Sequence, residues 1–166
     1  RRHTRFRNVT GVQTCALPII SLMRRLCADA IRAGAIGFSS ARLPSHQTKK
    51  GDPSPTLGAT DDELVEVACG VKDAGCGVIQ FTCDFPAKER KAELALIRRV
   101  LDATGRPLSM TLRQRHNDPE SWREVLEAIH QANDAGLRWR GQMAPRSVGT
   151  LFGLQISRHP FYLHPS

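Results

Sequence analysis

The sequence predicts an α/β fold with a parallel sheet. From Ser21 onward, one pattern occurs four times: an amphipathic stretch, a glycine, and a short apolar or β-branched run that ends in polar residues. The glycines are Gly34, Gly75, Gly105 and Gly136. Helices that alternate with short strands indicate βαβ units, because neighbouring parallel strands need a crossover connection.

Each helix is expected to end at its glycine, since glycine adopts the left-handed C′ conformation without a steric penalty. The first helix is predicted at Leu22–Ala33. The second is predicted at Asp61–Ala74, because Thr60 and Glu63 form a capping box ahead of an apolar stripe. The third is predicted at Pro86–Thr104, with its basic residues on the side opposite the leucines.

The fourth helix is predicted to start with Asp118 as N-cap and Pro119 at the first helical position, and to end near Ala135. One candidate strand follows each glycine. The predicted strands are Ala35–Ser40, Gly77–Thr82, Leu108–Leu112 and Leu137–Met143.

Open doubly wound sheets and closed barrels share this pattern, but no G-x-G-x-x-G turn follows any of the strands. Its absence favours a barrel. Four βα units make about half of a TIM-type (β/α)8 barrel and leave two strand edges unpaired. We therefore expect residues 21–166 to form a partial barrel that associates with a missing half or with itself.

Residues 1–20 differ from the rest in having no apolar periodicity and no helix cap. The string FRNVTGVQTCALPI within them resembles translated sequencing-adapter sequence. We expect this stretch to be a non-native or disordered leader, outside the fold.

Charge and composition argue against several classes of protein. Four arginines among the first seven residues supply half of the +8 formal charge, and the later basic residues are scattered, so no nucleic-acid partner is expected. No apolar run reaches 18 residues, so no membrane role is expected, and the five cysteines form no C-x-x-C pair or disulfide framework. Without a clear signal peptide, we expect a cytoplasmic protein.

Four strings stand in the order of a known family: GAIGFSSARLPSH, GVIQFTCDF, RPLSMTLRQ and RGQMAPRSVGTLFGLQISRHPF. Over about Leu22 to Phe161 the chain resembles the middle of the N-acyl-D-amino-acid deacylase (D-aminoacylase) branch of the amidohydrolases. The resemblance implies a (β/α)8 barrel with a small β-rich domain. It also implies hydrolysis of the amide bond of N-acyl amino acids by zinc-activated water.

The family's metal site begins with a His-x-His motif on its first strand, upstream of the matched region, and this chain contains no His-x-His. The metal-binding histidine that well-studied members place after a middle strand is also replaced here by other polar residues. Zinc is therefore expected for the full-length family, no metal ligand is identified in this chain, and the fragment is expected to be inactive alone.

In such barrels the chemistry gathers at the C-terminal ends of the strands. A guanidinium holds a carboxylate with two hydrogen bonds, so Arg42 and Arg146 are candidates for the substrate carboxylate, against the alternative of surface or capping arginines. The glutamines would orient a carbonyl, and the serines would either position substrate or cap a turn. The candidate substrate-binding residues are Ser39, Ser40, Arg42, Gln80, Gln114, Gln142 and Arg146.

Two residues are candidate catalytic groups. His46 lies in the long loop Leu43–Gly58 and is either an acid or ligand or a solvated loop histidine. Asp84 is either a general base or ligand or the N-cap of the third helix.

The leading hypothesis is a hydrolase that cleaves the amide bond of N-acyl (D-)amino acids or a related carbon–nitrogen bond. One alternative is a non-catalytic or metal-free barrel that binds a small carboxylate ligand. A basic binding module is a second alternative, and salt-dependent affinity for nucleic acid would distinguish it.

Overall fold

The computed structural model describes residues 9–44, 46–48, 51–83, 86, 88–115 and 118–145. Helices and strands alternate along the chain. The elements are α1 (Val9–Arg32), β1 (Gly37–Arg42), the 3-10 helix η1 (Pro55–Gly58), α2 (Asp61–Asp73), β2 (Val78–Cys83), α3 (Arg90–Thr104), β3 (Leu108–Thr111), α4 (Ser121–Asp134) and β4 (Trp139–Gln142). The predicted α/β class is confirmed.

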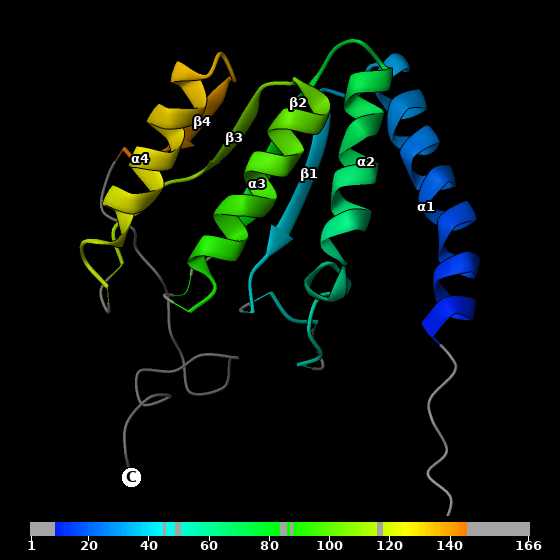
Figure 1. The fold of residues 1–166 in the computed structure, drawn as a ribbon, viewed down its shortest axis with the longest axis horizontal. Helices are drawn as coiled ribbons and strands as arrows, with labels where there is room; N and C mark the ends of the chain where they lie inside the picture. The colour runs from blue at the N-terminus through cyan, green and yellow to red at the C-terminus, as the bar shows by residue number, and fades with distance from the viewer. Residues whose placement is uncertain are drawn as a thin grey trace, which may run out of the picture.

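The four strands form one parallel sheet in the order β1-β2-β3-β4. Helices α1 to α4 lie on the same side of this sheet (Figure 1). A doubly wound sheet reverses its strand order at a switch point and carries helices on both faces, whereas here the order follows the chain without reversal. The predicted parallel βα units are confirmed, and a complete barrel stays a prediction.

Glycines end the helices as predicted. Gly34, Gly75, Gly105 and Gly136 have φ angles of 113°, 74°, 61° and 81°. The Thr60 hydroxyl accepts a hydrogen bond from the backbone N–H of Glu63 at 3.2 Å, as the capping box predicts.

Three helix starts differ from prediction. Helix α1 begins at Val9 rather than Leu22, so it includes Pro18 and part of the expected leader. Its first described side chains, at residues 17–19, are exposed. This part of α1 buries no face, so a helix forms there without the apolar periodicity that a buried helix face requires. Whether residues 1–20 are foreign to the domain stays a prediction.

Helix α3 begins at Arg90 rather than Pro86, and α4 begins at Ser121 rather than Pro119. The prediction that Asp118 caps α4 is wrong, because the N-cap position belongs to Glu120. The carboxylate of Asp118 pairs instead with Arg90, while its backbone oxygen accepts a hydrogen bond from the Ser121 hydroxyl at 2.6 Å.

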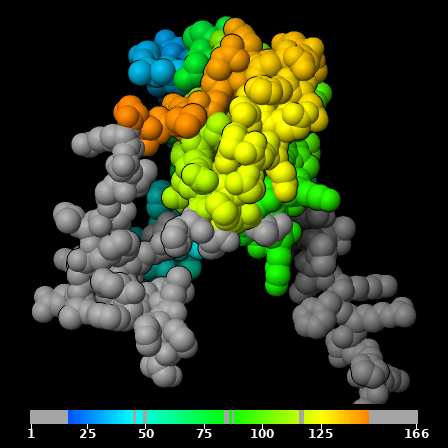
Figure 2. Space-filling view, turned by 90° about the vertical axis from the view of Figure 1, so that its left-hand side faces the viewer, coloured from blue at the N-terminus to red at the C-terminus, as the bar shows by residue number. Residues whose placement is uncertain are grey.

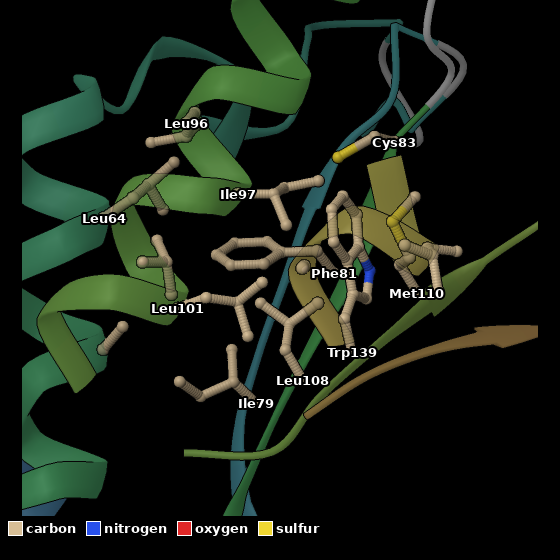
Figure 3. Close-up of a cluster of buried hydrophobic side chains, with 14 of the residues drawn as sticks. Leu64, Ile79, Phe81, Cys83, Leu96, Ile97, Leu101, Leu108, Met110 and Trp139 are labelled. Atoms are coloured by element: carbon tan, nitrogen blue, oxygen red, sulfur yellow. The ribbon is translucent and has the colours of Figure 1, made fainter. Parts of the chain in front are cut away.

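The core lies between the sheet and the helices. Figure 3 shows Ile79 and Phe81 of β2 among side chains of α3, β3 and β4. Phe81 and Trp139 are each 1% exposed, and Phe81 also makes an edge-to-face contact with Phe38 of β1. Because side chains alternate along a strand, the intervening residues of β2 face the other side of the sheet, away from the helices.

Helix α1 packs along α2 rather than against the strands. The two helix backbones approach closely at Gly70, where an added Cβ would lie 2.5 Å from the carbonyl oxygen of Arg24. The Arg24 guanidinium pairs with Asp73 at 2.6 Å and Glu66 at 2.9 Å, and its hydrogen bonds lower the pKa of the Asp73 carboxyl. On the described part of α1, the apolar side chains of Ile19, Leu22 and Leu26 stay exposed.

Within the described residues, no helix is both long enough and apolar enough to cross a bilayer.

Candidate functional site

The face of the sheet without helices is polar. Strand pairing places Ser39, Gln80, Ser109 and Arg140 side by side in one row across the four strands. The Ser39 hydroxyl donates a hydrogen bond to Gln80 Oε1 at 2.7 Å. This polar row combines neutral hydrogen-bonding groups with one guanidinium, a set suited to a ligand that carries carbonyl or carboxylate oxygens.

A second row lies nearer the C-terminal ends of the strands, where Thr82 stands beside Ala41 and Gln142 beside Thr111. Its residues add hydroxyl and amide groups to the same face. Across both rows, the described positions carry no carboxylate, so this face offers groups that bind and orient a ligand but no general base.

Arg140 ends the polar row at the edge of the sheet. Its Nη1 lies 2.9 Å from Asn133 Oδ1 and 3.2 Å from the backbone oxygen of Trp139. The amide of Asn133 also accepts from the backbone N–H of Trp139 at 3.2 Å, so it holds both the start of β4 and the guanidinium. Arg140 was not among the predicted site residues, because it was considered only as one of the scattered basic residues.

Ser39 and Ser40 do not share a site. Ser40 faces the helices and is 7% exposed, whereas Ser39 faces the polar side of the sheet. The two serines lie on opposite faces of the sheet, because adjacent residues of a strand alternate, and their roles in substrate binding stay a prediction.

Arg42 also faces the helices. Its Nη1 lies 2.6 Å from Asp61 Oδ1 at the start of α2, and its Nε lies 3.2 Å from Glu93 Oε1 in the first turn of α3. Two carboxylates of the same chain therefore occupy this guanidinium. That Arg42 binds a substrate carboxylate stays a prediction, and such a ligand would have to displace one of these partners.

Glu93 is a buried carboxylate that sequence analysis missed. Burial raises the pKa of its carboxyl, while Arg42 and the thiol of Cys83 act in the opposite direction. Its Oε2 is buried without a hydrogen-bond partner among the described residues. The signal in the sequence is its spacing: Glu93 precedes the buried Ile97 and Val100 at i+4 and i+7, so an acidic residue stands on a buried helix face.

The three glutamines do not converge. Gln80 and Gln142 lie on the polar face, but Gln114 lies beyond β3 and donates from Nε2 to the backbone oxygen of Pro119 at 3.1 Å. Gln114 is therefore separated from the other two glutamines, and the role of all three in orienting a substrate carbonyl stays a prediction. The separation arises because Gln114 follows the end of its strand, where the loop to α4 turns toward the helix side.

Gln114 instead borders an apolar hollow beside α4, with a volume of about 330 Å³. We call this the α4 hollow. It is lined by Leu112, Arg113, Gln114, Trp122, Leu126 and Met143. Its position at the open side of β4 makes it a gap in the apolar layer between sheet and helices.

The remaining candidates lie apart or outside the described chain. His46 is exposed in the loop after β1 and lines a shallow depression with Thr48 and Ser54, and its backbone oxygen accepts from the Ser54 N–H at 2.9 Å. Asp84 and Arg146 lie outside the described residues.

No group of three His, Cys, Asp or Glu residues that could hold a metal ion occurs in the described part of the chain. The polar face offers hydroxyls, amides and a guanidinium, which are not the nitrogen, sulfur and carboxylate ligands that zinc prefers. The described residues therefore do not fit a zinc site.

Comparison with known proteins gave no match to a family model, a curated protein or a solved structure.

Proposed function

We propose that this chain supplies the substrate-binding part of an amide hydrolase of the amidohydrolase type, acting on N-acyl amino acids or a closely related carboxylate. The observation that carries the proposal is the polar row Ser39–Gln80–Ser109–Arg140 on the helix-free face of a parallel sheet that follows chain order. The resemblance of its strand and loop strings to N-acyl-D-amino-acid deacylases supports the choice of substrate class.

Each group in the row has a role in this proposal. Arg140 would turn its guanidinium away from Asn133 and Trp139 and hold the substrate carboxylate through charge-assisted hydrogen bonds. Gln80 and Ser39, already hydrogen-bonded to each other, would fix the amide carbonyl. The described residues provide no base and no zinc ligands on this face, so we assign them binding and orientation and no proton-transfer step.

A second candidate function is binding of a small carboxylate without hydrolysis. It is favoured by the same face, which joins a guanidinium to neutral polar groups and carries no carboxylate among its described residues.

Replacement of Arg140 tests the proposed binding mode. With the complete 166-residue chain and N-acetyl-D-leucine as probe, Arg140→Gln is expected to weaken binding about tenfold, because a charge-assisted hydrogen bond is lost. Calorimetric titration measures the affinity. N-acetyl-D-leucinamide, which lacks the carboxylate, should bind both proteins equally weakly.

Arg98→Gln on the outer side of α3 is the matched control, and it should leave the affinity unchanged. Equal binding of N-acetyl-D-leucine by the Arg140→Gln and native proteins would rule out the proposed site. Release of leucine from the bound probe by the native chain would support hydrolysis and rule out the second candidate.

A further inference from the structure

Helix α1 carries an apolar stripe without a partner among the described residues. Ile19, Leu22 and Leu26 are 60%, 46% and 58% exposed, and their i, i+3, i+7 spacing places them on one side of the helix. The buried side of α1, with Ala28 and Ile31, is a different one. We call these three residues the α1 stripe.

The position of α1 in the fold explains why this stripe is exposed. Helix α2 precedes β2 in the chain and contacts both β2 and β1, so it covers the junction between its own strand and the strand before it. Helix α1 precedes β1, and β1 has no strand on its other side among the described residues. The junction that α1 would cover is thus missing its second strand.

The opposite edge of the sheet has the complementary gap. Strand β4 pairs with β3 alone within the described chain, and Figure 2 shows β4 (orange) at the surface beside α4 (yellow). The α4 hollow lies on the flank with Trp122 and Leu126, whereas Glu124, Glu127 and Gln131 line the flank toward α3. This edge has an apolar hollow and a free strand, and no helix covers them in the described structure.

We propose that the α1 stripe of one copy of this chain fills the α4 hollow of a second copy, with β1 of the first beside β4 of the second. The contact is head-to-tail, so the first copy keeps a free β4 edge and the second copy keeps a free β1 edge. Two copies satisfy both edges by making the contact twice, which closes eight parallel strands and eight helices into one ring. This inference rests on the topology and goes beyond the proposed hydrolase function.

A second copy fits because one chain supplies both halves of the contact: the exposed α1 stripe at one edge of the sheet and the α4 hollow at the other. Parallel pairing across the new junction would also satisfy the backbone groups that each edge strand leaves unpaired. Arg138 and Arg140 at this edge do not block it, because their guanidinium groups turn back to Gly105 O at 3.4 Å and Asn133 Oδ1 at 2.9 Å in their own chain.

Sedimentation equilibrium of the complete chain tests the proposal. The native protein is expected at twice its 18.4 kDa chain mass. A stripe variant, Leu22→Lys with Leu26→Lys, and a hollow variant, Leu126→Lys with Met143→Lys, should each weaken the dimer at least about 30-fold, since each places charge in an apolar contact. Ala92→Lys, at an exposed position in the first turn of α3, is the matched control and should remain dimeric.

Mixing the two variants gives the sharpest result. A stripe variant still has an intact hollow and a hollow variant an intact stripe, so the mixture can form one native contact that neither variant forms alone. A mixed dimer should therefore appear. Since Leu126 is partly buried, circular dichroism checks that the hollow variant folds, and Met143→Lys alone, at a side chain 74% exposed, repeats the test if it does not.

Three results would overturn the proposal: a monomeric native protein, a native protein that forms a series of larger species, or a dimer that survives the hollow substitutions. The first removes the contact, the second removes closure at two copies, and the third shows that the two copies meet elsewhere. None of them bears on ligand binding by Arg140, which is measured separately.

Discussion

Phe81→Ala is expected to lower the free energy of unfolding by about 4 kcal/mol. Phe81 is 1% exposed and lies at the centre of the apolar layer between β2 and α3, so truncation leaves a cavity that its neighbours cannot fill. Val78→Ala is the control in the same strand. Val78 is 41% exposed, and we expect its truncation to cost less than about 1 kcal/mol.

Urea denaturation of both variants measures the difference. A similar loss for the two would mean that the helices do not cover the face of the sheet that holds Phe81. A large loss for Phe81→Ala alone supports the division of the sheet into a buried face and a polar face, on which the candidate site depends.

Arg42→Ala is the second substitution with a large expected effect. It should lower the free energy of unfolding by about 3 kcal/mol at neutral pH, because it leaves Glu93 as a buried charge without its guanidinium. The loss should be smaller in acid. Burial already raises the pKa of Glu93 from its ordinary value near 4.5, and removal of Arg42 raises it further, so the folded variant holds a proton to higher pH than the unfolded chain.

The sign of this pH dependence is specific. A raised carboxyl pKa gives stability that is present below the ordinary value and is lost as pH rises through the folded value. Arg42→Met combined with Glu93→Leu should recover most of the loss, since an apolar pair leaves no unpaired charge. A loss that is equal at all pH values and not recovered by the double substitution would show that Glu93 is not the cause.

Sequence alone predicted the order and type of the elements well. The capping box at Thr60 and the four glycines at helix ends act within a few residues of the chain, so local chemistry decides them. Helix starts were less predictable, because competing partners lie far away: Asp118 pairs with Arg90, which is 28 residues distant.

The candidate site was predicted only in part. Ser39 and Gln80 do meet, because strands that follow glycine-ended helices pair in parallel and in register. Ser40 and Arg42 were placed at the same site because the end of the strand was recognised but its alternation was not applied. The pairing of Arg42 with Glu93 joins β1 to α3 across 51 residues of chain, which no local pattern records.

Nuclear Overhauser contacts between backbone protons of neighbouring strands distinguish this strand arrangement from the alternatives. We expect parallel contacts that join Ser39 to Gln80, Gln80 to Ser109 and Ser109 to Arg140, in the order of the chain. Close contacts between Hα protons of neighbouring strands, which mark antiparallel pairing, or contacts that place the strands in another order, would contradict this arrangement.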